Sequence, residues 1–178
     1  MHKIGDKILY GAAGVMTILD IREESVGDIS RSYYVLGSAT RRSDSLTYVP
    51  ADNEALVSAM RPLLTESEIV EAIRASLVDG SIDWIPENRA RSEYFKKIME
   101  SGDRARMLAM IRAIDESGLK RIAEGKKNFL SDENAKQKAE KLLFSEFSIV
   151  LGIPEEDIPE FIEKNKKGAV TFGKTEKV

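Results

Sequence analysis

The sequence predicts a chain of two parts, a small antiparallel β domain followed by an all-α helical bundle. Over roughly the first 60 residues, short runs alternate polar and apolar side chains between glycine-containing turns, a pattern typical of strands. From Thr65 onward, the apolar residues recur at helical spacing instead. We therefore place a β domain at residues 1–60 and a helical domain at residues 65–165, and we expect residues 166–178 to form a disordered tail.

The composition agrees with this division and excludes several classes of protein. The chain has 178 residues, of which 42% are hydrophobic and 32% are charged, enough for one domain or two small ones. No apolar run approaches the roughly 20 residues needed to cross a bilayer. The N-terminal segment MHKIGDKILY also lacks the layout of a secretion signal. We therefore expect a cytoplasmic protein.

The inventory of reactive side chains argues against catalysis and against a metal site. The chain has no cysteine and a single histidine, His2. Disulfides, thiolate metal sites, cysteine nucleophiles and His-centred triads are therefore excluded. No pair of carboxylates has a spacing that distinguishes it from solvated surface charge. We expect no enzyme activity, no cofactor and no metal.

Four short segments are predicted to be strands. They are IGDKILY, VMTILDI, SYYVLGSA and SLTYVP, and the turns between them include GAAG and a Gly-Asp pair. Such strands favour a closed or nearly closed antiparallel barrel. Pro50 ends the last clear strand, so the backbone at residues 46–49 is predicted to form an open edge.

Helix boundaries in the second part are marked by capping residues and glycines. Thr65 and Glu68 form a capping-box pattern at the start of the first helix. The second helix is expected from Pro86 to about Glu100. Asp103 is then expected to cap a third helix.

The later helices follow from similar patterns. We expect a Ser-Gly interruption in the third helix, before Leu119 and Ile122. Ser131 is predicted to cap a fourth helix that ends at Gly152. A short fifth helix should open at Pro154, and a second proline, at position 159, should distort or restart it.

The net charge of −3 conceals a block structure. Acidic residues dominate from Thr65 to Asn88, and basic residues dominate from Arg89 to Lys127. A central basic block can meet phosphate, although a solvated helix face is the more common explanation of such a run.

Several segments occur in an order that resembles the CarD/CdnL family of bacterial transcription regulators. These are KIGDKILYGAAGVMTILDI, YYVL, YVPADN, IDWIPENRARSEYFKKIMESGD and LSDENAKQKAEKLLFSEFSIVLGIPEEDI. The resemblance implies a Tudor- or SH3-like N-terminal barrel that binds the RNA polymerase β subunit. It also implies a helical domain that contacts promoter DNA at the upstream edge of the melted region. We expect the protein to be a monomer.

The resemblance further implies that the only tryptophan, Trp84, acts as a minor-groove wedge. A wedge between base steps needs cations nearby to hold the phosphates. The predicted DNA-binding residues are Trp84, Arg89, Arg91, Lys96 and Lys97, with Arg91 nearer the apolar side of its helix. The alternative is that Trp84 is a packing residue, which is the commoner use of a single tryptophan.

The polymerase contacts of the family correspond to two strands of the β domain. They fall on Arg22 and Glu24 in one strand, and on Thr47, Tyr48 and Val49 in the other. Main-chain pairing with a polymerase strand tolerates varied side chains. Two other classes of function remain open. The first is a protein–protein adaptor that does not bind DNA, with Trp84 in a domain interface, and the second, less favoured, is an enzyme.

Overall fold

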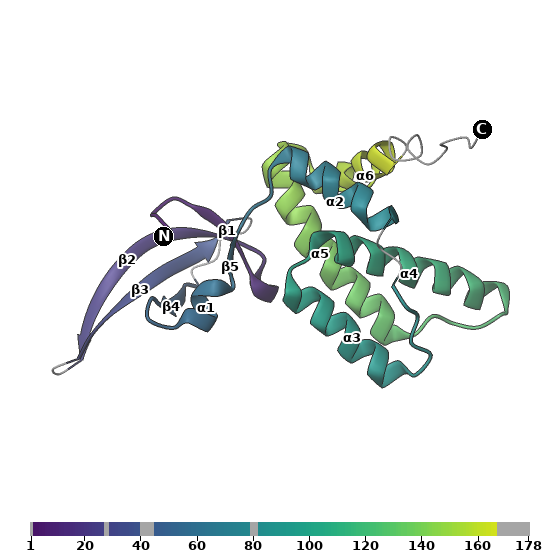
Figure 1. The fold of residues 1–178 in the computed structure, drawn as a ribbon, viewed down its shortest axis with the longest axis horizontal. Helices are drawn as coiled ribbons and strands as arrows, with labels where there is room; N and C mark the ends of the chain where they lie inside the picture. Colours follow the sequence, from purple (N-terminus) through teal and green to yellow (C-terminus); the bar gives the residue numbers. More distant parts are fainter. Residues whose placement is uncertain (1, 27–28, 40–44, 79–81, 167–178) are drawn as a thin grey trace, which may run out of the picture. The chain divides into compact units, whose positions relative to one another are not determined.

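The computed structural model describes residues 2–26, 29–39, 45–78 and 82–166 (Figure 1). The chain forms two compact units, Met1–Leu63 and Leu64–Val178. The first unit contains all the strands of the described residues, and the second contains only helices. This order of elements confirms the predicted fold class. The prediction of a disordered tail lies outside the described residues, apart from residue 166.

The first unit is built on a five-stranded antiparallel sheet with the strand order β4-β3-β2-β1-β5. Its strands are β1 (Lys7–Tyr10), β2 (Val15–Val26), β3 (Ile29–Ser38), β4 (Thr47–Pro50) and β5 (Met60–Pro62). A single 3-10 turn, Gly11–Ala13, joins β1 to β2. Ile8, Ile18 and Leu36 lie in a core that the sheet encloses. β4 and β5 are the two edges of this sheet.

Two elements of the first unit were not predicted. They are the short helix α1 (Glu54–Ser58) and the strand β5, which pairs with β1. α1 is capped by Asn53, whose Oδ1 accepts a hydrogen bond from the backbone N–H of Leu56 at 3.1 Å. Both elements are too short to show a periodic pattern. α1 lies between β4 and β5 in the chain and contacts both of these edge strands.

The second unit is a bundle of five α-helices in the described residues (Figure 1). They are α2 (Glu66–Val78), α3 (Asn88–Ser101), α4 (Arg104–Ala123), α5 (Leu130–Leu151) and α6 (Ile158–Lys166). α5 contacts each of the other four helices, and its residues Leu143 and Phe147 are fully buried. A 3-10 turn, Glu155–Asp157, precedes α6, and Pro159 lies in the first turn of that helix, where no N–H is needed.

The predicted caps at Thr65 and Asp103 are confirmed. The backbone N–H of Thr65 donates to the Glu68 carboxylate at 2.7 Å, and the backbone N–H of Glu68 donates to the Thr65 hydroxyl. Asp103 accepts a hydrogen bond from the backbone N–H of Arg106 at 3.0 Å. Gly102 ends α3 with a left-handed φ of 65°, which glycine adopts without a steric cost.

Two predictions about the later helices are wrong. α4 continues through Gly118 without an interruption, and the missing side chain of this glycine leaves room for Asn128 to pack against the helix. A Cβ atom at position 118 would lie 2.9 Å from Asn128 Nδ2. Ser131 does not cap α5, which begins at Leu130. Its hydroxyl donates instead to the side-chain oxygen of Asn88, at 2.8 Å.

A buried ion pair fixes the start of the helical unit. Both carboxylate oxygens of Glu146 on α5 accept hydrogen bonds from Arg104 on α4, at 2.8 and 3.0 Å. One of these oxygens also accepts from the backbone N–H of Leu64, at 3.0 Å. The Glu146 side chain is fully buried, and this pairing compensates for the loss of its hydration.

Truncation of the core should destabilise the helical unit strongly. Phe147→Ala should lower the free energy of unfolding by about 3–5 kcal/mol, because it leaves a cavity where a large side chain was buried. Urea titration followed by the fluorescence of Trp84, the only tryptophan, measures this loss. Leu119→Ala is the control: Leu119 is 69% exposed, so the change should stay within about 0.5 kcal/mol. Equal losses for both variants would contradict this packing.

Candidate functional site

The edge strand β4 leaves part of its main chain unpaired within the sheet. The backbone N–H of Ala51 donates to the carbonyl of Ser32 at 2.8 Å. In an antiparallel ladder only alternate residues bond to the neighbouring strand. Because Ala51 bonds to β3, the alternation gives bonds to β3 at Val49 and none at Tyr48. Tyr48, which lies opposite Val35, therefore points its N–H and C=O away from β3. Pro50 points the same way, and its missing N–H costs nothing at an edge.

The side chains of β4 divide between the two faces of the sheet. Val49 is fully buried in the core, whereas Tyr48 on the other face is 43% exposed. Leu19 lies on the same face as Tyr48, because a Cβ atom at Gly37 would lie 2.6 Å from Leu19 Cδ1. Leu19 is itself 49% exposed. The open edge is therefore bordered by an exposed aromatic and an exposed aliphatic side chain.

The structure brings three of the five predicted polymerase-binding residues to this face. Arg22 and Glu24 lie on β2 opposite Tyr33 and Arg31, and they share the sheet face of Tyr48. Arg22 donates two hydrogen bonds to Asp20, at 3.1 and 3.2 Å. The pKa of Arg22 is raised, first by this bonding and then by the nearby Tyr48.

The other two predicted polymerase-binding residues, Thr47 and Val49, lie on the core-facing side of β4. Thr47 is partly exposed. The prediction for Val49 is corrected by the structure. Its side chain is fully buried, and the alternation of the ladder directs its main chain to Tyr34 of β3. Neither part of Val49 can reach a partner at the edge.

Arg91 is also corrected as a predicted DNA-binding residue. Its side chain is 0% exposed, so it cannot reach a phosphate. The guanidinium forms a buried ion pair with Asp132 of α5, with Nη2 and Nε at 2.9 to 3.2 Å from the carboxylate oxygens. A buried charge requires such a partner. Arg91 therefore acts inside the helical unit.

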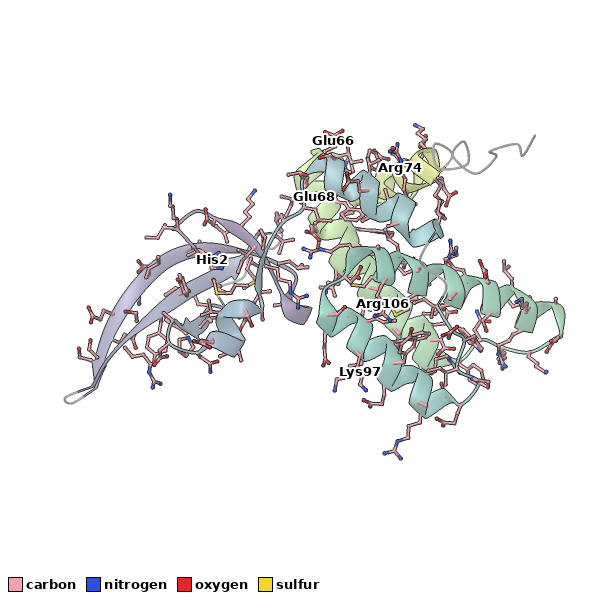
Figure 2. All side chains as sticks on the ribbon, viewed as in Figure 1. His2, Glu66, Glu68, Arg74, Lys97 and Arg106 are labelled. Carbon is pink, nitrogen blue, oxygen red and sulfur yellow. The ribbon has the colours of Figure 1, made fainter. Side chains whose placement is uncertain are left out.

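The remaining predicted cations lie on the solvent face of α3. Arg89, Lys96 and Lys97 are all exposed, and Figure 2 shows Lys97 extending outward from the helix. Glu93 and Glu100 share this face, and Lys96 lies 3.9 Å from Glu100. The face is therefore mixed in charge, and its attraction for phosphate is smaller than three cations alone would give.

Trp84 lies on the other side of α3. Its ring packs 6.3 Å from that of Phe95 and 4.5 Å from the Arg91 guanidinium carbon, and it remains partly exposed. At 3.6 residues per turn, Arg91 and Phe95 face away from Arg89 and Lys96. The structure thus brings Trp84 together with Arg91 and does not bring it together with the exposed cations.

A second basic segment joins α4 to α5. It lies within the basic block from Arg89 to Lys127, but none of its residues was predicted to bind DNA. The guanidinium carbon of Arg121 lies 3.9 Å from the centre of the Phe129 ring, and its Nε donates to the carbonyl of Lys127. Lys126 and Lys127 are exposed, and Lys126 pairs with Glu124. In the sequence, only the density of positive charge between two predicted helices indicates this segment.

The residues covered by the structure contain no cluster of three or more His, Cys, Asp or Glu side chains that could hold a metal ion. Within the same residues, no helix combines the length and the apolar character that a bilayer span requires.

Comparison with known proteins finds a family that the first unit resembles. Residues 2–64 match the family model described as the CarD-like/TRCF RID domain. The first unit is therefore similar to CarD-like/TRCF RID domains, and we call it the RID domain. The match ends where the second unit begins, so it covers the sheet and α1 but none of the helices α2 to α6. No curated protein matches the chain.

This match confirms the resemblance to CarD-like proteins drawn from the sequence. The match supports a transcription-related protein that interacts with RNA polymerase. The open edge at Tyr48 lies within the matched residues. The geometry of the RID domain therefore offers a main-chain surface of the kind that binds an extended partner strand.

Removal of the Glu87 charge should weaken the start of α3. The Glu87 carboxylate accepts hydrogen bonds from the backbone N–H groups of Ala90 and Arg89, which hold its pKa below the ordinary value. A lowered folded pKa stabilises the protein above the unfolded pKa, and this stabilisation is lost as pH falls through the folded value. Glu87→Gln should therefore be less stable than the wild type at pH 7, and the gap should narrow below about pH 4.5.

Thermal unfolding at both pH values measures this difference. Glu93→Gln is the matched control, because Glu93 lies on the solvent face of the same helix and caps nothing. A gap of constant size across this pH range would show that the charge of Glu87 does not act through the helix terminus.

Proposed function

We propose that the protein is a non-catalytic, cytoplasmic transcription regulator. Its RID domain binds the RNA polymerase β subunit through the edge of β4, and its helical unit contacts promoter DNA at the upstream edge of the melted region. The observation that carries the proposal is the open main chain of Tyr48 within residues that match the RID family. The protein acts as a monomer on each polymerase.

Pairing at the edge would add a polymerase strand to the sheet. The N–H and C=O of Tyr48 supply hydrogen bonds, and the exposed side chains of Tyr48 and Leu19 supply apolar contact. Arg22 and Glu24 lie on the same face and would set the charge preference of the contact. Thr47 borders the edge from the core-facing side.

DNA contact by the helical unit is supported by its exposed cations and by Trp84. The RID domain would hold this unit near the promoter and raise its local concentration, so a mixed-charge surface suffices despite the net charge of −3. Arg89, Lys96 and Lys97 would meet phosphates, while the exposed part of Trp84 fills the minor groove beside an unstacked step.

The effect on promoter opening would come from differential binding. A protein that binds open promoter DNA more tightly than closed DNA shifts the equilibrium by that difference, typically about 1–3 kcal/mol. Recognition would depend on DNA shape and melting more than on base sequence.

A protein–protein adaptor is the second candidate, and one observation favours it. Trp84 packs against Arg91 and Phe95, on the side of α3 opposite to Arg89 and Lys96. In this reading, Trp84 stabilises the helical unit, and the exposed faces of the helices bind another protein. The two candidates share the polymerase contact and differ in the role of Trp84.

Tyr48→Pro should abolish the main-chain contact without disturbing the sheet. The substitution removes an N–H that points away from β3, so no ladder hydrogen bond is lost. Affinity for purified RNA polymerase should fall by about tenfold or more, the equivalent of one or more hydrogen bonds. Tyr48→Val, which keeps the N–H, is the matched control and should retain more of the affinity. Equal binding by both variants would place the polymerase contact elsewhere.

Trp84→Ala separates the DNA-binding candidate from the adaptor. If Trp84 acts as a wedge, the lifetime of the open complex should fall by about five- to 150-fold, the range of such couplings. Binding to polymerase alone should not change. The adaptor is supported instead if promoter opening is unchanged while the free energy of unfolding falls by several kcal/mol.

A further inference from the structure

Four side chains of the helical unit form a stack in which aromatic rings alternate with guanidinium groups. Trp84 lies against Arg91, Arg91 lies against Phe129, and Phe129 lies against Arg121. The distances from guanidinium carbon to ring centre are 4.5, 5.0 and 3.9 Å in this order. Cations within about 6 Å of a ring are attracted to its face, more strongly when they are desolvated. Arg91 is completely desolvated.

The hydrogen bonds of Arg91 hold the segment that carries Trp84. Its Nη1 donates to the carbonyl of Ile85 at 2.7 Å and to that of Pro86 at 3.1 Å, and its Nη2 donates to Asn88 Oδ1 at 3.1 Å. Ile85 and Pro86 directly follow Trp84 in the chain. Arg91 therefore contacts the indole ring and also fixes the backbone beside it.

Asp132 fixes Arg91 in turn. It lies in the first turn of α5, where the positive end of the helix dipole favours a carboxylate. Its two oxygens receive the Nε and Nη2 bonds of Arg91, so all three guanidinium nitrogens are bonded. A second link joins the same parts, because the Ser131 hydroxyl donates to Asn88 Oδ1. The position of Trp84 is thus set by α3 and α5 together.

We propose that Arg91, held by Asp132, is a positioning residue that orients the exposed edge of Trp84 for its contact with DNA. The inference rests on the proposed function for its purpose, and on the stack and the hydrogen bonds for its geometry. A buried ion pair adds little net stability compared with apolar packing. The hydrogen bonds of Arg91 reach three segments of the helical unit, so they restrict how these segments lie relative to one another. A side chain that inserts between base steps must be held in one orientation.

Lysine cannot replace Arg91 in this role. The guanidinium is planar, so it can lie flat between Trp84 and Phe129 while its edge donates to Asp132, Ile85 and Pro86. A lysine ammonium keeps the charge but has no flat faces and fewer donors. Arg91→Lys therefore removes the positioning while it preserves the sign of the buried charge.

The test uses Arg91→Lys and Asp132→Asn in the full-length chain, with Arg104→Lys and Glu146→Gln as matched controls. The controls alter the other buried ion pair of the same bundle, which does not contact Trp84. The first readout is the fluorescence of Trp84, which is the only tryptophan in the chain. We expect a red-shifted emission and several-fold greater quenching by acrylamide in the two test variants, and no such change in the controls.

The second readout is the lifetime of the open complex with RNA polymerase. Arg91→Lys should shorten it nearly as much as Trp84→Ala, and the double variant should be no worse than Trp84→Ala alone, because both changes remove one unit. Circular dichroism checks folding. If Arg91→Lys fails to fold, Asp132→Asn provides both readouts, since it keeps the size and an acceptor oxygen of the original side chain.

Two outcomes would overturn the proposal. One is unchanged Trp84 fluorescence in folded Arg91→Lys and Asp132→Asn. The other is altered fluorescence with a wild-type lifetime of the open complex, in a system where Trp84→Ala shortens it. If Trp84→Ala itself leaves the lifetime unchanged, the proposed DNA contact fails, and the fluorescence of the variants still decides whether Arg91 orients the indole.

Discussion

A guanidinium group that loses all contact with water must have its N–H groups bonded, and Arg91 meets this requirement within the helical unit. Its partners come from the segment after Trp84, from α3 and from the first turn of α5. An unpaired charge at this position would cost several kcal/mol. The bundle can therefore close only when these three parts have reached one relative arrangement, and the proposed DNA contact at Trp84 depends on that arrangement.

In the RID domain, by contrast, some main-chain polar groups have no partner within the sheet. Strands in the middle of its sheet bond on both sides, but the main chain of Tyr48 lies at an edge and points away from β3. Such an edge is a template for pairing with another chain. The short length of β4 and the proline at its end limit this pairing to a few residues. One unit thus bonds a buried polar group completely, and the other leaves a short main-chain segment for a partner.

Much of the fold could be predicted because its signals are local. The Thr65 capping box and the Asp103 cap lie within a few residues of their partners, and Pro50 marks the edge strand. The site was harder to predict because its interactions are distant. The helical period placed Arg91 near the apolar face, but nothing local identifies Asp132, on another helix, as its partner. Asp132 and its neighbour Ser131 instead resembled an ordinary helix start, and the inward side of Val49 depended on a strand register that alternation alone does not fix.

The hydrogen bond that anchors Leu64 can form only late in the synthesis of the chain. Leu64 and Arg104 both bond to Glu146, which the ribosome adds long after either of them. Pairings between residues so far apart in sequence form late, because a long loop must close first. The matched domain at residues 2–64 has all its strands much earlier. During translation, the matched domain is therefore complete while the bundle still lacks the carboxylate that pairs with Arg104.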